Sequence, residues 1–286
     1  MNNLILIVLT SHRKDGLRLC FHNLEKYTDL DRFKYVYVLA NAVDEEHAAL
    51  ISDFKARHRN VIDAHFKPRG IYTTIAMEGA VLGKHRDDII VKLDEDVFVT
   101  EGWLDPMLEA YHATRNSRII LLSALVPNNQ VGKNCLEPHL RQHFGASYTE
   151  EVALNPAHRN SHYAEWIWQQ FLAGHLRDAR CPIIAGCDPA PFQGYLNINC
   201  IMFDRRMMDL VLPFRLTDEH AMNLALAEND LMGVMLPNAV AHHYSFKHQQ
   251  AYLDEHLGIA PIAAHFGLHD AGVHPMPPVY PLAAQA

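Results

Sequence analysis

The strongest constraint on the fold is an alternation of short apolar runs with amphipathic stretches over residues 4–124. The first run, residues 4–9, contains no polar residue, which is typical of a central strand that is covered on both faces. Strands that alternate with helices at this spacing predict a parallel sheet with helices on both faces. The predicted strands are 4–9, 35–39, 61–66, 89–93 and 119–124, and the predicted helices are 16–27, 44–57 and 73–82.

The second half of the chain is less regular. It mixes Asn, Gly, Pro and aromatic residues, and its predicted elements are helices 163–176 and 218–232 and strands 196–203 and 239–244. We therefore expect an α/β, Rossmann-like fold with a mostly parallel central sheet and an irregular second half. One domain should cover residues 1–253, in halves 1–126 and 127–253, followed by a C-terminal tail, 254–286, rich in Pro, Ala and His.

Several classes of function are disfavoured. The formal net charge is -8 and no run of Lys or Arg occurs, so the chain lacks the electrostatic footprint of a nucleic-acid-binding protein. No G-x-G-x-x-G follows the first strand, which argues against an NAD enzyme, and no P-loop motif is present.

The cysteines and the apolar runs indicate the compartment. Five cysteines at irregular spacing, without a C-x-x-C pair, favour free thiols in a reducing cytoplasm. No apolar run is long enough to span a bilayer, and the N-terminal run lacks the basic leader of a signal peptide. The expectation is a cytoplasmic protein without a transmembrane segment, which leaves room for peripheral association with the inner face of the membrane.

An acidic triplet, Asp94-Glu95-Asp96, follows directly after predicted strand 89–93. Ligands in open α/β sheets bind beyond the carboxyl ends of the strands. In an extended segment, Asp94 and Asp96 would face the crevice together and Glu95 would point away. Two convergent carboxylates repel each other, and a bound Mg²⁺ or Mn²⁺ that also contacts substrate phosphates would relieve the repulsion. The alternative interpretation is a solvated acidic turn.

The segment Val91-Lys92-Leu93-Asp94-Glu95-Asp96-Val97 resembles the D-x-D segment of GT-A glycosyltransferases, including the large bacterial family 2. Upstream, Pro68-Arg69-Gly70 and Ala76-Met77-Glu78-Gly79-Ala80 are similar to that family's N-x-G and A-R-N-x-G stretches, with Arg69 in place of Asn and Met77-Glu78 in place of Arg-Asn. The resemblance covers residues 4–104. It implies that half 1–126 binds a nucleoside diphosphate sugar, UDP before other nucleotides, and that half 127–253 binds a glycan or lipid-linked saccharide acceptor.

The same resemblance implies catalytic and metal-binding residues in the second half. Glu228-Asn229-Asp230 is similar to the acidic motif that supplies the base in inverting enzymes of this fold, with Asp230 as the first choice and Glu228 as the second. Such a carboxylate would remove a proton from the acceptor hydroxyl. A C-terminal histidine would complete the metal shell formed by Asp94 and Asp96. Because adjacent residues of a strand face opposite sides, only one of His242 and His243 can do so, and His242 is favoured.

The resemblance also places the nucleotide at the end of the first strand. The candidates for contacts with the base and ribose are Thr10, Ser11 and Arg13, with Asn41 or Asp44 for a second contact with the base. Arg69 and Lys92 are the candidates for the diphosphate, and Asp94 and Glu95 lie beside the metal. For the acceptor, flat apolar faces are available on Trp103, Trp166, Trp168 and Tyr195, with Asn197 and Asn199 nearby. Trp166 and Trp168 lie two apart in a predicted helix and cannot share a face.

Three other functions remain open at this stage. A retaining glycosyltransferase would share the acidic triplet and the histidine. A nucleotidyltransferase on a similar fold is disfavoured, because residues 10–16 lack the Gly-rich loop that such enzymes carry after the first strand. A carbohydrate-binding protein with a decayed site is disfavoured by the presence of Asp94, Asp96 and Asp230.

Overall fold

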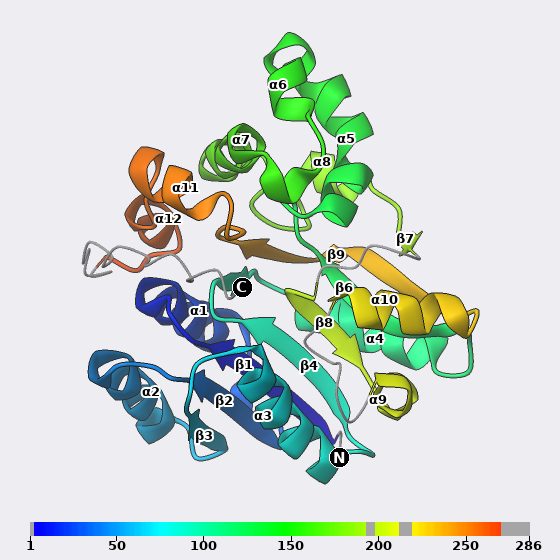
Figure 1. Ribbon diagram of the computed structural model, residues 1–286. Coiled ribbons are helices and arrows are strands. Elements are labelled where there is room, and N and C mark those ends of the chain that lie inside the picture. Colours follow the sequence, from blue (N-terminus) through cyan, green and yellow to red (C-terminus); the bar gives the residue numbers. More distant parts are fainter. Residues whose placement is uncertain (1–2, 193–197, 212–218, 270–286) are drawn as a thin grey trace, which may run out of the picture.

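The computed structural model of the protein describes residues 3–192, 198–211 and 219–269. Within these ranges the strands form one nine-stranded sheet (Figure 1). The strands are β1 (Leu4–Thr10), β2 (Tyr35–Asn41), β3 (Val61–Phe66), β4 (Ile89–Asp94), β5 (Val97–Val99), β6 (Ile119–Leu125), β7 (Ala190–Phe192), β8 (Cys200–Phe203) and β9 (Met232–His243). Their order across the sheet is β3-β2-β1-β4-β8-β6-β9-β5, and β7 pairs with β9.

The central part of the sheet is parallel, as predicted. Strand β1 pairs in parallel with β2 and β4, and β2 pairs in parallel with β3. Strand β8 is inserted antiparallel between β4 and β6, and β6 is parallel to β9. The carboxyl ends of β1, β2 and β4 therefore lie along one edge of the sheet, where ligands of open α/β sheets bind.

Helices cover both faces of the sheet (Figure 1). The helices are α1 (Lys14–Tyr27), α2 (Glu45–Arg57), α3 (Ile71–Lys84), α4 (Leu104–Thr114), α5 (Gln130–Phe144), α6 (Glu150–Ala153), α7 (Ser161–Leu172), α8 (Pro182–Ala185), α9 (Arg205–Val211), α10 (Glu219–Glu228), α11 (Gln250–His256) and α12 (Ala260–His265). In the part of the chain that the structure describes, none of these helices has the length and apolar character needed to cross a bilayer. All five cysteines are free thiols, as predicted.

The apolar run of β1 is shared between two cores. Leu4, Leu6 and Val8 pack in a first core with α1, α2, α4 and α12. Ile5 and Ile7 pack in a second core with α3, α5, α9 and α10. Successive side chains of a strand point to opposite faces, so a strand buried on both sides needs apolar residues at every position.

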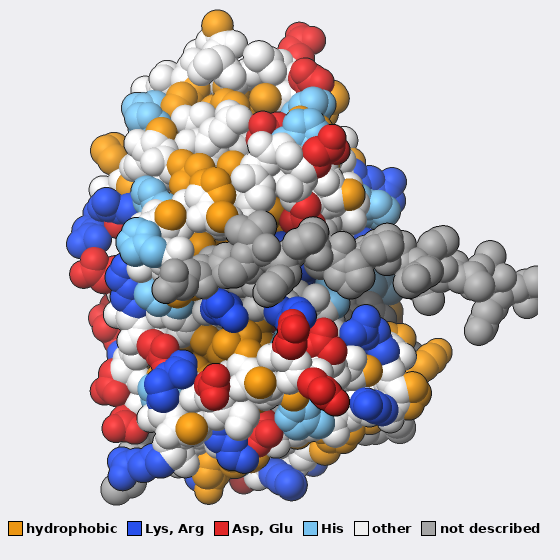
Figure 2. Space-filling view, turned by 90° about the vertical axis from the view of Figure 1, so that its left-hand side faces the viewer, with side chains coloured by type: hydrophobic (Ala, Val, Ile, Leu, Met, Phe, Trp, Pro, Cys, Tyr) orange, Lys and Arg blue, Asp and Glu red, His pale blue; other side chains and the backbone are white. Residues whose placement is uncertain are grey.

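The outer surface of the molecule carries both basic and acidic side chains (Figure 2). On the face shown in Figure 2, basic and acidic side chains are interspersed. Exposed pairs of this kind, such as Arg57 with Glu25 at 2.8 Å, contribute little to stability individually.

The tryptophans predicted for acceptor binding are structural instead. Trp103, Trp166 and Trp168 are all buried, and the last two belong to different cores, as their spacing in the helix requires. The indole N–H of Trp103 donates to Thr28 and that of Trp168 to the carbonyl of Tyr244, both at 2.9 Å. None of the three presents a face to a ligand. The predicted acceptor residues Tyr195 and Asn197 lie outside the described residues.

The domain boundary predicted at residue 253 is wrong. Helix α11 runs through it, from Gln250 to His256, and α12 places Ile262 and Ala263 in the first core. The predicted helix 218–232 is also too long at its end, because Asp230 has φ 53°, a left-handed conformation that ends α10, and β9 begins at Met232.

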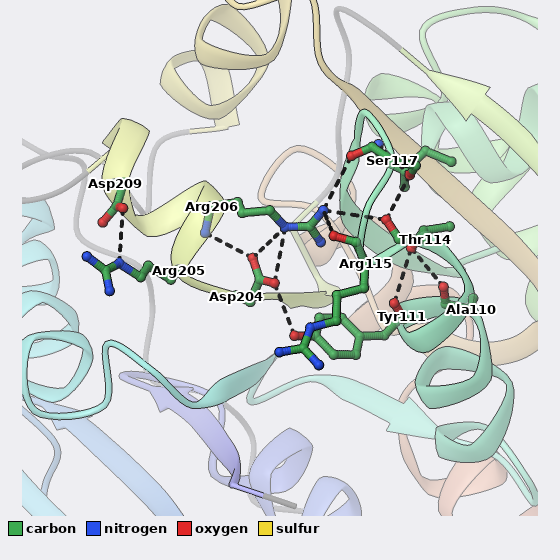
Figure 3. Close-up of polar contacts among 10 residues, drawn as sticks. Ala110, Tyr111, Thr114, Arg115, Ser117, Asp204, Arg205, Arg206 and Asp209 are labelled. Atoms are coloured by element: carbon green, nitrogen blue, oxygen red, sulfur yellow. Dashed lines mark hydrogen bonds and ion pairs between the residues drawn. The ribbon is translucent and has the colours of Figure 1, made fainter.

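A polar network fixes the opposite edge of the sheet, away from the carboxyl ends of the parallel strands (Figure 3). The guanidinium of Arg206 donates to the carbonyls of Thr114, Arg115 and Ser117 at 2.8–3.4 Å and to the carboxylate of Asp204 at 3.1 Å. These carbonyls follow the last turn of α4, where backbone acceptors have no partner within the helix. The network therefore anchors α9 to α4 and has a structural role.

A pair of glycine variants tests how tightly α5 is packed. A Cβ atom on Gly132 would lie 2.0 Å from the carbonyl oxygen of Val126, whereas one on Gly83 in α3 meets nothing within 4 Å. We expect Gly132→Ala to lower the free energy of unfolding by roughly 3 kcal/mol. The control Gly83→Ala should raise it by about 0.5 kcal/mol, because alanine favours the helix. Urea denaturation measures both, and equal values for the two variants would contradict this packing.

Candidate functional site

A cavity of about 1390 Å³ opens at the carboxyl ends of the parallel strands. The strand ends that line it carry Thr10 and Ser11 at the end of β1, Asn41 and Asp44 at the end of β2, the acidic triplet at the end of β4, and His243 at the end of β9, and Glu219 lines it from the start of α10. These segments are far apart in the sequence, and the sheet brings them together because its parallel strands end at the same edge.

Asp94 and Asp96 both line this cavity. Asp94 is the last residue of β4, and residues 95–96 form a turn that leads into β5, so the triplet is not an extended segment. The carboxylate of Asp94 accepts a hydrogen bond from the Asn199 amide at 3.2 Å. Burial raises the pKa of Asp94, and the charge of Asp96 raises it further, against the opposing effects of Lys92 and His243. Positive charge in this place would stabilise both carboxylates.

Glu95 points to the loop after β1. Its buried carboxylate accepts hydrogen bonds from the Thr10 hydroxyl, from the backbone N–H of Ser11 at 2.8 Å and from that of His12 at 3.1 Å. Burial alone would raise the pKa of Glu95, but the bonds from His12, Thr10 and Ser11 outweigh it and lower the pKa to about 2. Glu95 thus holds the loop after β1 and also lines the cavity, and its contact with the donor stays a prediction.

The two histidines at the end of β9 face opposite sides, as predicted. His243 faces the cavity, however, and His242, the favoured candidate, faces away from it. His242 is buried in the first core, where its ring packs 4.5 Å from that of Phe171 and its Nε2 lies 3.2 Å from the carbonyl of Arg177. Burial lowers its pKa to about 4. The preference for His242 as a metal ligand was therefore wrong, because the pairing of β9 with β5 sets which residue faces the cavity.

His243 is the histidine that reaches the acidic turn. Its Nε2 lies 3.4 Å from a carboxylate oxygen of Asp96, and its Nδ1 is buried without a hydrogen-bond partner among the described residues. Burial alone would lower the pKa of His243, but the negative charges of Asp96, Asp94 and Glu219 outweigh it and raise the pKa.

Arg13 does not line the cavity. Its buried guanidinium pairs with Asp15 at 2.8 Å and with Asp254 at 3.1 Å, and it lies 4.5 Å from the ring centre of Tyr244. It connects the loop after β1 to α11, so its predicted contact with the donor is replaced by a structural one. No local pattern indicates this pairing, since Asp254 lies 241 positions away.

The other predicted donor residues are at the cavity. Asn41 donates to the carbonyl of Gly70 at 3.1 Å, while its Oδ1 is buried without a partner among the described residues. Asp44 caps α2 by accepting the backbone N–H of His47 at 2.8 Å. The Arg69 guanidinium donates to the carbonyls of Ser11 and Ala42 at 2.8 and 3.0 Å. These three residues, together with Thr10 and Ser11, form a polar rim.

The predicted catalytic carboxylates lie outside the cavity. Glu228 is exposed, and the side chain of Asp230, which is 80% exposed, pairs with Arg118. Neither residue belongs to the cavity lining. Both lie at the far end of α10, since a helix of ten residues extends about 15 Å.

Glu219 lies in the cavity, where Glu228 and Asp230 were expected. It was not among the residues predicted from the sequence. It begins α10, lines the cavity and accepts the backbone N–H of Ile198 at 3.4 Å. Burial raises its pKa, and the nearby charge of Asp94 raises it further, although Ile198, Lys92 and His243 oppose the shift. Its place near the start of the predicted helix 218–232 is the signal that could have indicated Glu219.

The acidic turn and His243 together offer two ligand atoms to a divalent cation. Within the three described ranges, no group of three or more His, Cys, Asp or Glu side chains is arranged to enclose an ion. Mg²⁺ and related ions, however, are commonly held by one or two carboxylates together with substrate phosphates and water. Asp96 and His243, at 3.4 Å, offer one oxygen and one nitrogen ligand, a combination that suits Mn²⁺.

Comparison with known proteins identifies the fold. No protein-family model and no curated protein sequence matches the chain. Among solved structures, mannosyltransferase PcManGT from Pyrobaculum calidifontis, in complex with GDP-Man and Mn²⁺, matches 96% of this chain with a TM-score of 0.54 and 12% identity. GalNAc-T7 with UDP, GalNAc and Mn²⁺ matches 87% of this chain with a TM-score of 0.53 and 10% identity. The chain has a GT-A fold.

This chain with its GT-A fold spans only part of the length of each of the two proteins that it matches. The matched region spans 66% of the mannosyltransferase chain and 45% of the GalNAc-T7 chain. At these levels of identity the likeness concerns the fold, so the activity of this GT-A chain has to be argued from its own residues.

A variant of Glu95 tests its role in the GT-A cavity. In Glu95→Gln, the side-chain amide replaces an acceptor by a donor next to the N–H groups of Ser11 and His12, which leaves at least one of these part-buried donors unpaired. We expect the free energy of unfolding at pH 7 to fall by about 1–3 kcal/mol. The control Glu101→Gln, whose side chain is 63% exposed, should leave it nearly unchanged. Similar stability of both variants would show that the loop does not depend on Glu95.

Proposed function

We propose that this protein is a metal-dependent glycosyltransferase that moves a sugar from a nucleoside diphosphate sugar to a glycan or lipid-linked acceptor. The observation that carries the proposal is the pairing of Asp96 with His243 at 3.4 Å, beside Asp94, in the cavity of a GT-A fold. The solved structures with this fold include one described with GDP-Man and Mn²⁺ and one with UDP and Mn²⁺.

The metal would be Mn²⁺ or Mg²⁺, held by Asp96 and His243 with Asp94 close by. When bound, it would neutralise negative charge on the departing nucleoside diphosphate. Asp94 and Asp96 are half-buried next to apolar strands, and burial raises the pKa of Asp94, so the protein itself favours a cation there. The Nδ1 of His243, which is buried and has no partner within the three described ranges, is a further polar atom that a bound ligand or water would satisfy.

The nucleotide would lie along the polar rim at the ends of β1 and β2. The Oδ1 of Asn41 is a buried acceptor without a partner among the described residues and is suited to a donor group of the base. The loop that Glu95 holds presents Thr10 and Ser11 to the same space. Arg69 supplies positive charge at the cavity wall. UDP is the first choice of nucleotide, and GDP is the alternative to test beside it.

Glu219 would be the catalytic base, in place of Asp230. It lines the cavity together with Asp94 and Lys92, and burial raises its pKa toward the range in which a carboxylate removes protons effectively. A base opposite the departing diphosphate takes the proton of the acceptor hydroxyl as the sugar carbon is attacked, which gives inversion. By analogy of fold, the setting would be bacterial polysaccharide assembly in the cytoplasm or at the inner face of the membrane.

Nucleotide binding tests the metal site. We expect UDP or GDP to bind at least about tenfold more tightly with Mn²⁺ than without it, as measured by calorimetry. His243→Gln should remove most of this metal dependence, because the imidazole ligand is lost. The control Asp230→Asn should retain it, because that side chain lies outside the cavity. A preference for a nucleoside triphosphate would favour the nucleotidyltransferase, and metal-independent binding would argue against the proposal.

Turnover tests the base. Glu219→Gln keeps the shape of the side chain and removes its basicity, so kcat for sugar transfer should fall by about 10²–10⁴-fold while the donor still binds. Asp230→Asn is again the matched control and should transfer at the wild-type rate. Analysis of the product anomer by NMR determines whether transfer inverts. Full activity of Glu219→Gln, or a retained anomer, would show that Glu219 is not the base.

A further inference from the structure

A buried ion pair lies at the inner end of the cavity. Lys92 and Glu78 are 3% and 1% exposed, and their Nζ and Oε1 atoms are 3.1 Å apart. Lys92 projects from β4 and lines the cavity, whereas Glu78 belongs to α3 and stands outside the lining. Glu78 therefore holds the ammonium group from behind.

The ammonium group retains hydrogen-bonding capacity. It carries three N–H donors, and Glu78 is its ion-pair partner among the described residues. Asn199, which also lines the cavity, uses its amide N–H to bind Asp94 at 3.2 Å, and its Oδ1 is buried without a partner in the described part of the chain. Buried polar groups are normally satisfied, so donors and acceptors left over on the wall of one cavity indicate a polar occupant.

The position of Lys92 separates it from the expected diphosphate. On a strand, residues two apart share a face and lie about 6.6 Å from each other, so Lys92 stands deeper in the cavity than Asp94. Asp96, which pairs with His243, follows Asp94 in the turn and so lies further still from Lys92 along the chain. The positive charge of Lys92 is also balanced by Glu78. Both observations argue against its predicted contact with the diphosphate.

The charges around Lys92 favour a neutral occupant. Three carboxylates, those of Glu78, Asp94 and Glu219, act on this one ammonium group. A carboxylate on the ligand would be a fourth negatively charged group around Lys92. The three protein carboxylates would repel it, and this repulsion is strong in a site of low dielectric. Hydroxyl groups both donate and accept hydrogen bonds and add no charge.

We propose that Lys92, held in place by Glu78, is a specificity-determining residue that donates hydrogen bonds to hydroxyl groups of a neutral donor sugar and disfavours a sugar bearing a carboxylate. This inference rests on the proposed function and names the class of sugar for the same site. Lys92 contacts the sugar, and Glu78 is a positioning residue that acts through it.

The difference in affinity between a nucleoside diphosphate and its sugar conjugate tests this role. Lys92→Met alone would leave Glu78 buried and unpaired, so the double variant Lys92→Met/Glu78→Gln, which removes both charges and keeps the side-chain volumes similar, is the better probe. Calorimetry in Mn²⁺ is carried out with UDP, UDP-glucose and UDP-glucuronic acid, and with GDP and GDP-mannose. The control is Lys55→Met, a half-exposed residue outside the cavity.

The wild type should bind one neutral sugar conjugate at least about tenfold more tightly than its nucleoside diphosphate, and UDP-glucose more tightly than UDP-glucuronic acid. The double variant should lose the first ratio and keep the affinity for the nucleoside diphosphate within about twofold. A parallel loss of both affinities, or an unchanged ratio, would overturn the proposal. Circular dichroism shows whether the double variant folds. If it does not fold, the wild type alone decides: tighter binding of UDP-glucuronic acid than of UDP-glucose would overturn the proposal. Absence of metal-dependent binding of any nucleoside diphosphate would instead contradict the proposed function.

Discussion

Burial of the central strands on both faces is the constraint from which the rest of the structure follows. Strands β1, β2 and β4 divide their side chains between two apolar cores, so little room remains within the sheet for charged groups. Polar side chains can gather where the strands end, and the parallel direction of these strands places their ends along one edge. Lys92 and Glu78 are the exception, since both are buried next to that edge and neutralise each other.

The geometry of the proposed metal site depends on two connections that join distant segments. The pairing of β5 with β9 places His243 opposite Val97, one residue after Asp96, and the backbone N–H of Tyr244 donates to the carbonyl of Asp96 at 2.9 Å. On the other side of the turn, Glu95 binds the loop after β1. The acidic turn is therefore held from both sides by hydrogen bonds, which limits how far Asp94 and Asp96 can move apart when a ligand enters.

Local patterns predicted the first half of the fold well. Residues 61–66 form the strand that their β-prone composition indicated, and the strands from residues 4, 35 and 89 begin where predicted, because burial on both faces gives a continuous apolar run. The position of Asp94 and Asp96 at a sheet edge follows from the same pattern. Which of His242 and His243 faces the cavity does not follow from it, since this depends on the strand with which β9 pairs in the folded sheet. The same holds for Arg13, whose partner Asp254 is distant in the sequence, and for Glu219, which a tertiary contact brings to the cavity.

The packing of α12 has a consequence for how the chain folds. Lys26 and His22, in the first helix, contact the carbonyl of Phe266, about 240 residues later, and Phe266 belongs to the same core as β1. Contacts between such distant positions require closure of a very long loop, whose entropic cost slows their formation. During synthesis on the ribosome, the part of α1 that contacts Phe266 therefore stays uncovered until residue 266 has emerged. That nascent intermediate is the species in which we expect chaperones to matter most.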